Sequence, residues 1–395
     1  MTGGRPEQRP ALWTRDFWLI SLATFFIFTS FQMLMPTLPK YLQFLGAREG
    51  MVGLVAGLFS VSALLIRPFI GHELDRRGRR GIYLYGLGFF VLAVLAYRWA
   101  PGVWTVFAIR LFHGVAWGMV TTAAGTIVSD IVPPSRRGEG MGYYGMFANL
   151  AMAVAPASGL YVLYHYNYPP VFYGSAVLAA VALLLATRLR HNEPRQDPPS
   201  PAAPLYEPRA LYPALIALLV TFNYGSVVTF LQLYAEQRGI TNIGPFFTVY
   251  AVTLMSTRPF AGRLYDRLGP HSVIVPGLAL IAVALLFLSQ AQSLPVFLVA
   301  GILYGLGFGA AHPALQALTV TGVPPSRRGA ANATFFSAFD LGIAAGALLL
   351  GLVAQVSGYP TMYLTAAGVV LLALAAYWLL PRAFPQAAAP HREQA

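Results

Sequence analysis

Long apolar stretches alternate with short polar turns along the whole chain. A helix needs about 20 apolar residues to cross a bilayer, and by that measure the sequence predicts twelve membrane-spanning helices. The first is longer than the core of a signal peptide and lacks an Ala-x-Ala cleavage pattern, so we expect it to be retained. The predicted limits are 17–41, 50–70, 81–99, 103–130, 139–164, 170–188, 211–235, 244–264, 272–290, 295–321, 329–357 and 360–380.

A motif repeat divides these spans into two sets of six. Residues 67–78 are echoed by residues 258–269, an offset of 191 positions. The same offset relates 134–138 to 325–329, and Gly114 and Gly118 to Gly305 and Gly309. A period this long indicates two copies of a half-protein. The fold class predicted is an all-α membrane protein, with twelve transmembrane helices in two pseudo-symmetric six-helix bundles.

Composition supports a polytopic membrane protein. Hydrophobic residues make up 57% of the chain and charged residues only 10%, with a mean hydropathy of +0.60, whereas soluble domains are about a quarter charged. The net charge of +12 would suggest nucleic acid in a soluble protein, but here we interpret the arginines as topology signals. We therefore expect no nucleic-acid partner. The absence of cysteine excludes disulfides and thiolate metal sites.

The positive charges also predict the orientation. If the N-terminus is cytoplasmic, 19 of the 26 Lys and Arg lie in cytoplasmic segments and four lie outside. This bias predicts that both termini and the Pro-rich linker are on the cytoplasmic side of a prokaryotic inner membrane. The expected parts are a cytoplasmic segment 1–16, a bundle 17–189, a linker 190–209, a second bundle 210–381 and a tail 382–395.

The charged turn at 71–80 has the pattern Gly-x-x-x-Asp-Arg-x-Gly-Arg. With twelve spans in two homologous halves, it resembles the loop motif of the major facilitator superfamily, except that Glu73 stands where leucine is usual. The resemblance implies a gate on the cytoplasmic side; the alternative is a signal for topology and folding alone. We expect Asp75 to face the helix that starts near Gly329. The implied gate residues are Gly71, Asp75, Arg76, Gly78, Arg79, Asp130, Gly262, Asp266 and Arg267.

The fourth and fifth helices carry two further resemblances to this family. Residues 110–118 are similar to its Arg-x-x-Gln-Gly signature, which implies a role for Arg110 in proton coupling. His113 replaces the glutamine and either adds a titratable group or, as we favour, keeps a hydrogen bond. The fifth helix resembles a Gly-rich signature associated with export by antiport, although small residues four apart also serve helix packing. The packing residues expected are Gly142, Ala151, Ala155, Pro156 and Gly159, with Gly342 and Gly346 in the repeat.

Asp340 is the acidic residue that we place near the middle of a span. It lies two positions from the small-residue stripe of its helix, hence on the opposite side, where we expect the central cavity. The repeat places Asn149 at the matching position of the first half. Ionisable groups at mid-membrane are usually functional, so Asp340 is the candidate proton carrier. The alternative is a structural hydrogen bond, for example to His312, which we include among the coupling residues.

Arg67 and Arg258 form a second symmetric pair, each followed by proline. They could hold an anion between the halves, but arginines near a helix end more often extend towards the headgroups, and both readings stay open. Polar and aromatic residues suggest a cavity for an amphipathic organic molecule. The expected cavity residues are Phe31, Gln32, Tyr144, Phe147, Asn149, Asn223, Tyr224, Phe336, Phe339 and Asp340.

With no nucleotide-binding loop, transport would be driven by an ion gradient. The resemblance is to the twelve-helix drug:proton antiporters, so we expect a monomeric exporter of small amphipathic compounds that exchanges them for protons by alternating access. Many relatives have an acidic residue in the first helix, where this chain offers Ser30 and Gln32. The alternatives are a proton symporter for uptake of an organic anion and a non-transporting receptor. We expect no enzymatic activity, metal or cofactor.

Overall fold

The computed structural model describes residues 10–47, 49–190, 204–240 and 242–379, and within these ranges the chain is helical, with no strand. Three 3₁₀ turns, η1 to η3, connect or extend the helices: Tyr97–Trp99, Pro134–Arg136 and Pro325–Arg327. The α-helices are α1 Arg15–Phe44, α2 Glu49–Arg77, α3 Arg79–Ala96, α4 Val103–Ile131, α5 Arg137–Tyr166, α6 Tyr168–Thr187, α7 Pro208–Gln237, α8 Gly244–Leu268, α9 His271–Ser289, α10 Leu294–Val320 and α11 Arg328–Leu379.

The long α11 contains the last two predicted spans. Gly358 has a left-handed backbone (φ 80°, ψ 167°), a conformation that glycine adopts readily. This kink, followed by Pro360, divides α11 into segments 328–357 and 359–379, close to the predicted 329–357 and 360–380. Each of the twelve predicted spans therefore corresponds to a helical segment. Among the described helices, nine are long and apolar enough to cross a membrane, with α11 counted once.

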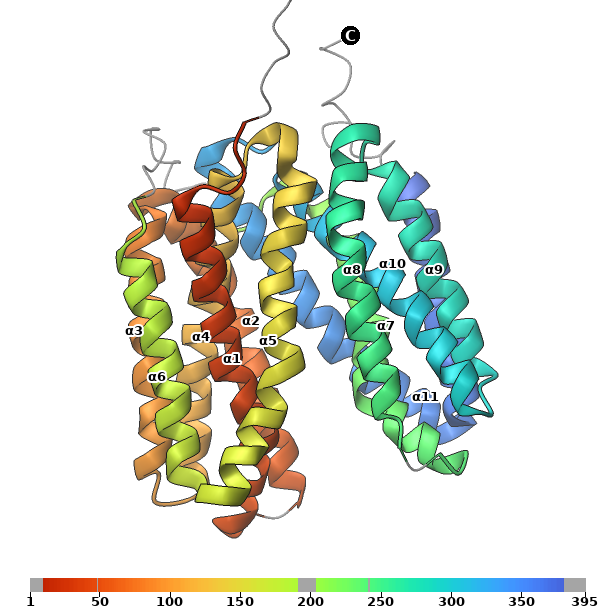
Figure 1. Cartoon of the computed structure of the whole chain (residues 1–395), viewed down its shortest axis with the longest axis horizontal. Helices are drawn as coiled ribbons and strands as arrows, with labels where there is room; N and C mark the ends of the chain where they lie inside the picture. Colours follow the sequence, from red (N-terminus) through yellow and green to blue (C-terminus); the bar gives the residue numbers. More distant parts are fainter. Residues whose placement is uncertain (1–9, 48, 191–203, 241, 380–395) are drawn as a thin grey trace, which may run out of the picture.

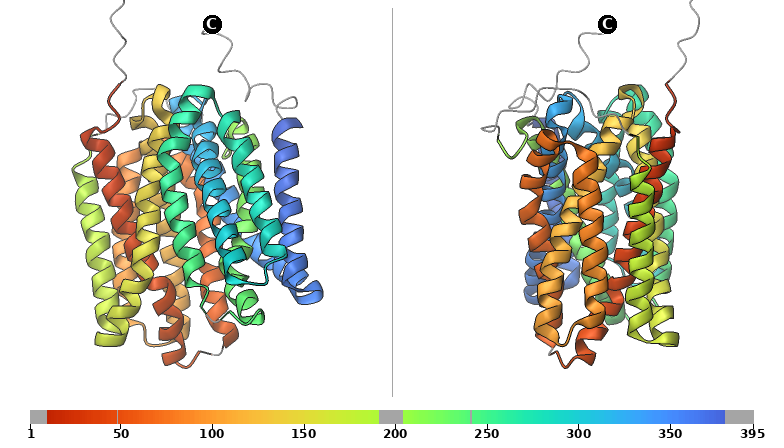
Figure 2. Two further views of the ribbon diagram at one scale, coloured as in Figure 1. Left: turned by 45° about the vertical axis from the view of Figure 1, so that its right-hand side comes forward. Right: turned by 90° about the vertical axis from the view of Figure 1, so that its left-hand side faces the viewer.

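The helices form two bundles, α1–α6 and α7–α11 (Figures 1 and 2). In the first bundle α1 packs against α5 and α6, and α2 against α4; in the second, α7 packs against α11, and α8 against α10. The bundles meet mainly where α2 packs on α11 and α5 packs on α8. The ribbons of α5 and α8 lie close together at the end of the molecule where α1 begins and diverge towards the other end (Figure 1). We call the former the closed end.

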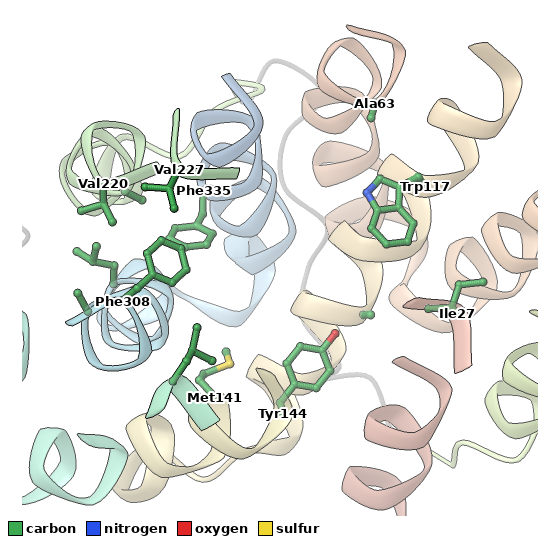
Figure 3. Close-up of a cluster of buried hydrophobic side chains, with 14 of the residues drawn as sticks. Ile27, Ala63, Trp117, Met141, Tyr144, Val220, Val227, Phe308 and Phe335 are labelled. Atoms are coloured by element: carbon green, nitrogen blue, oxygen red, sulfur yellow. The ribbon is translucent and has the colours of Figure 1, made fainter. Parts of the chain in front are cut away.

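Each bundle has its own buried apolar interior. Ile27, Ala63 and Trp117 lie in the first bundle and Phe308 and Phe335 in the second, while Met141 and Tyr144 of α5 lie between them (Figure 3). The buried apolar side chains thus form one cluster that extends through both bundles, with side chains of α5 between the two parts.

Small residues allow α5 and α11 to approach their neighbours closely. Ala151 and Ala155 are fully buried, and a Cβ on Gly159 would overlap the backbone of Met33 in α1. In the repeat, Gly342 and Gly346 lie against α7 in the same way. Gly142 also lies at a close helix contact, in this case against the Arg258 carbonyl of α8 in the other bundle. Pro156 lies within α5 and is half-buried.

Replacement of Gly346 by alanine should destabilise the protein. A Cβ there would overlap the carbonyl oxygen of Phe222, which belongs to the α7 backbone and cannot rotate away. Forcing an extra carbon into such a contact typically costs about 1–3 kcal/mol. Gly88→Ala is the matched control, because a Cβ at Gly88 meets nothing within 4 Å. Thermal unfolding in detergent should show a lower midpoint for Gly346→Ala than for wild type; an unchanged midpoint would contradict this packing.

Candidate functional site

A buried ion pair joins the two bundles through α2 and α11. The Arg67 guanidinium donates to Asp340 Oδ2 from Nε at 2.9 Å and from Nη2 at 2.8 Å. Its Nη1 donates to the hydroxyls of Thr121 and Thr122 on α4, at 2.7 and 3.1 Å. The Arg67 side chain is 2% exposed and that of Asp340 is 19% exposed. The Asp340 side chain is therefore the more exposed member of the pair.

The repeat produces a related contact between α8 and α5. Arg258, the counterpart of Arg67, is 3% exposed and faces Asn149, the counterpart of Asp340. With the amide oxygen of Asn149 towards the guanidinium, it accepts from Nε at 3.1 Å and from Nη2 at 2.9 Å. Two arginines at equivalent positions thus reach across the bundle interface, one to a carboxylate and the other to an amide.

These contacts correct two interpretations of the sequence. Arg67 and Arg258 are buried and do not extend to the headgroups, since each has a partner on the opposite bundle. His312 does not bond Asp340: both of its ring nitrogens are buried without a hydrogen-bond partner in the described part of the chain. The His312 ring instead packs against Phe308, Phe335 and Phe339, with centroids 5.1 to 5.6 Å apart.

The predicted cavity residues divide into two groups. Asn149 and Asp340 belong to the two pairs themselves, the Phe336 ring is 5.1 Å from the Arg67 guanidinium, and Phe339 packs against His312. The other six have partners within their own bundle or are only half-buried. Asn223 is fully buried and accepts from Tyr304, Tyr224 stacks on Phe308, Tyr144 accepts from Thr24, Phe31 stacks on Trp117, Phe147 packs edge-on against Trp18, and Gln32 is half-buried.

Arg110 and His113 lie within the first bundle. The Arg110 guanidinium lies over the ring of Phe59, 4.2 Å from its centroid, and Nη2 is 3.8 Å from the Met35 sulfur. His113 Nδ1 is 3.1 Å from the Tyr97 hydroxyl, as expected of a residue that keeps a hydrogen bond. No contact joins Arg110 to Asp340 in the part of the chain that the structure describes, so any coupling between them must act over a distance.

At the closed end, two aspartates bind the starts of helices on the opposite bundle. Asp75 accepts from the backbone N–H groups of Gly329 at 2.8 Å and Ala330 at 2.9 Å. Asp266 accepts from Gly138 at 2.7 Å and Glu139 at 2.9 Å, the same contact in the repeat. The predicted contact between Asp75 and the helix near Gly329 is therefore present. A carboxylate suits this place because the first N–H groups of a helix have no partner within it.

Burial affects the ionisation of both aspartates. Asp75 lies beyond the predicted span 50–70, and burial raises its pKa to about 7, although the two N–H groups and Arg79 act in the opposite sense. Burial likewise raises the pKa of Asp266. Separation of α2 from α11 would hydrate Asp75 and lower its pKa. The bonds to Gly329 and Ala330 favour the ionised carboxylate and oppose this effect of burial.

Glycines and a third acid complete the closed end. A Cβ on Gly71 would overlap α11, and one on Gly262 would overlap α5, so both glycines are required for the close approach of the bundles. Asp130 binds Arg79 at 3.2 Å within its own bundle and Arg328 at 2.7 Å on the other. Gly78 adopts a left-handed backbone before α3. Arg76 contacts Glu73 and Arg267 is exposed, so neither is placed across the interface.

Several residues of these contacts were not identified from the sequence. Thr121 and Thr122 belong to no recognisable motif. They accept hydrogen bonds from Arg67 because α4 packs close to it, which the sequence does not indicate. Glu139 binds Arg263 of the other bundle at 3.1 Å and could have been suspected, because an acid in the first turn of a helix next to an arginine-rich loop is a common pairing site. A Cβ on Gly145 would overlap the guanidinium of Arg258, which would then have to move.

Comparison with known proteins agrees with this architecture. The Major Facilitator Superfamily family model matches residues 20–253 and again residues 214–395. An uncharacterised MFS-type transporter of Methanocaldococcus jannaschii is 23% identical over 363 residues, which cover 88% of this chain and 94% of the relative. The multidrug resistance protein MdtG of Salmonella typhi is 26% identical over 385 residues, 93% of this chain and 95% of the relative.

Solved structures show the same fold. The human organic anion transporter MFSD10 superposes with a TM-score of 0.79 at 21% identity, covering 93% of this chain and all of the other. FucP, in the outward conformation, superposes with a TM-score of 0.73 at 16% identity, covering 93% of this chain and 97% of the other. Two matches of the family model, together with two bundles related by a sequence repeat, identify the molecule: the chain belongs to the Major Facilitator Superfamily and is a multi-pass membrane transporter.

Proposed function

We propose that this transporter exports small amphipathic organic compounds in exchange for protons, with Asp340 as the proton carrier. The observation that carries the proposal is the ion pair between Arg67 and Asp340, which joins the bundles and in which the Asp340 side chain is the more exposed member. A proton on Asp340 removes the charge that balances Arg67, and a buried charge that has lost its partner is strongly destabilising. Protonation would thus favour the separation of α2 from α11, and so couple a proton to the bundle movement.

Drug export is supported by resemblance and by the composition of the interface. The small-residue stripe of α5 resembles the antiporter signature, and relatives that align over 93% of the chain are named multidrug resistance proteins. Aromatic rings of α10 and α11 gather beside the polar pairs, where they could hold an apolar ligand. Proton-coupled uptake of an organic anion is the second candidate, because two buried arginines lie at the bundle interface.

We further propose that the closed end is cytoplasmic and that Asp75 and Asp266 act as its gate. The charge bias of the loops supports this orientation. Each aspartate makes two bonds to the opposite bundle, and such bonds to a charged group contribute about 1.5–3 kcal/mol each. The conformation would then be outward-facing, and transport would require these bonds to break in each cycle.

Asp340→Asn should abolish transport driven by a pH gradient in proteoliposomes while retaining exchange of substrate in the absence of a gradient. Asparagine keeps the size of the side chain but cannot carry the proton. The measurement is uptake of radiolabelled 1-naphthylacetate, an amphipathic carboxylate, with and without an imposed gradient. Glu236→Gln is the matched control, since Glu236 is an exposed carboxylate at the end of α7. Full gradient-driven transport by Asp340→Asn would exclude Asp340 as the carrier.

The direction of coupling separates the two candidates. In vesicles of known orientation, antiport predicts that protons leave the vesicle lumen as the added substrate enters it. Symport predicts that protons and substrate enter the lumen together. Proton entry in the same direction as 1-naphthylacetate, unchanged by Asp340→Asn but lost in Arg67→Ala, would identify an anion symporter and contradict export.

The double substitution Asp75→Asn with Asp266→Asn should open the closed end. The chain has no cysteine, so Ser129→Cys, at a fully buried residue beside Asp130, provides a single thiol to report access. Loss of the charged acceptors should raise its rate of labelling by a membrane-impermeant maleimide in inside-out vesicles by about tenfold, the equivalent of about 1.4 kcal/mol. Glu73→Gln is the control, because Glu73 contacts only its own turn. Unchanged labelling of the double variant would disprove the gate.

A further inference from the structure

The two arginines that cross the bundle interface have unequal charge balance. Arg67 faces the carboxylate of Asp340, so that pair is neutral. Arg258, at the equivalent position of the repeat, faces the amide of Asn149, which carries no charge. Among the residues that the structure describes, no carboxylate forms an ion pair with Arg258. One positive charge at this interface therefore has no carboxylate to balance it within the described ranges.

Such a charge is unfavourable in a buried place. The Arg258 side chain is 3% exposed, and a buried charge without a counter-ion is far more costly than a buried pair. The structure nevertheless makes room for it: Gly145 lies so close to the Arg258 Nη1 that any side chain there would overlap it. The repeat has the large Phe336 at the position equivalent to Gly145. The sequence thus leaves space on α5 for the Arg258 guanidinium but has no carboxylate there to pair with it.

Further hydrogen-bonding groups without partners belong to α10, which packs on α5 beside Arg258. Gln316 is 4% exposed, and its Nε2 is buried with no partner. His312 is close enough to Arg258 to interact with its charge, and both of its ring nitrogens are unpartnered. His312 also stands at the position equivalent to Thr121, the residue that binds Arg67 in the first half.

The position of Gln316 relative to Arg258 follows from the repeat. Its counterpart is Gly125, where a Cβ would contact the Phe336 side chain. The counterpart of Phe336 is Gly145, against which the Arg258 guanidinium lies. By this symmetry the Gln316 side chain is directed towards the guanidinium. The amide N–H and the guanidinium N–H groups are all donors, so the missing component is an acceptor with a negative charge.

We propose that Arg258, with Gln316 and His312 beside it, forms a subsite for one carboxylate of the transported compound, so that the substrates are amphipathic organic monoanions. A single guanidinium matches a single negative charge and binds a carboxylate with two parallel hydrogen bonds. The rings of Phe308, Phe335 and Phe339 around His312 would receive the apolar part. Asn149 is half-buried and marks the side from which the carboxylate would replace its amide oxygen. The inference deepens the proposed function and rests on transport of an organic compound.

The test compares two probes that differ in charge and otherwise match, 1-naphthylacetate and 1-naphthylacetamide. Binding to the purified full chain in nanodiscs is measured at one pH with no gradient, by equilibrium dialysis. Wild type should bind the carboxylate at least about tenfold more tightly than the amide, and Arg258→Gln should lose this preference while its affinity for the amide stays the same. Arg98→Gln, which removes an exposed arginine far from the interface, is the control and should retain it.

Asn149→Asp provides a second variant in case Arg258→Gln does not fold. This substitution gives position 149 the same residue as its counterpart, Asp340. The new carboxylate should pair with Arg258 even when no ligand is bound. The thermal midpoint of the unliganded protein should rise, and the preference for 1-naphthylacetate should disappear. These two changes together would not result from a purely structural role of Arg258.

The proposal is overturned if wild type binds both probes equally, if neither probe binds at concentrations up to about 1 mM, or if the preference persists in both Arg258→Gln and Asn149→Asp. The result is independent of proton coupling, because no gradient is applied. Loss of the charge preference in the Arg258 variant, together with normal gradient-driven transport by Asp340→Asn, would support the subsite and exclude the proposed proton carrier.

Discussion

A guanidinium buried between two bundles needs a partner from the opposite bundle, and this requirement organises the interface. Arg67 meets it with Asp340, and two threonine hydroxyls on α4 bind its remaining face. Because desolvated charges interact strongly and are costly to separate, the position of α2 relative to α11 depends on the charge state of one carboxylate. The Asp340 side chain is also the more exposed member of the pair. Under the proposed mechanism, protonation of Asp340 would weaken the contact between the bundles without any rearrangement inside either of them.

The closed end joins the two bundles through a different interaction. Asp75 and Asp266 bind backbone N–H groups at the starts of α11 and α5, so the contact requires no particular side chain on the opposite helix. Gly71 and Gly262 let the backbones approach closely enough for these bonds to form. The first bundle adds an ion pair between Asp130 and Arg328. The repeat has Thr321 in place of Asp130, so the two sides of this end are alike in geometry but differ in charge.

Much of this architecture could be predicted from the sequence, because it depends on local patterns. The twelve spans follow from apolar length, the two halves follow from the 191-residue offset, and the contact of Asp75 with α11 follows from the chemistry of helix starts. The partner of Asp340 could not be predicted. Helical periodicity gives the face on which Asp340 lies but not the helix that packs on that face. The tendency of arginines to reach the headgroups then favoured the wrong interpretation of Arg67 and Arg258, which neighbouring helices bury.

The departures from internal symmetry indicate where function has modified the duplicated scaffold. In a strictly symmetric protein, both interface arginines would have the same partner, and the two pairs would respond alike to protons. Here Arg67 faces Asp340 and lies against Phe336, whereas Arg258 faces Asn149 and lies against Gly145. The contact around Arg67 is neutral and contains a group that can be protonated. The contact around Arg258 is positive and contains hydrogen-bond donors without acceptors. If Asp340 carries the proton and Arg258 binds the substrate carboxylate, as we propose, two equivalent positions bind two different ligands, and a transporter that couples two fluxes needs that difference between its halves.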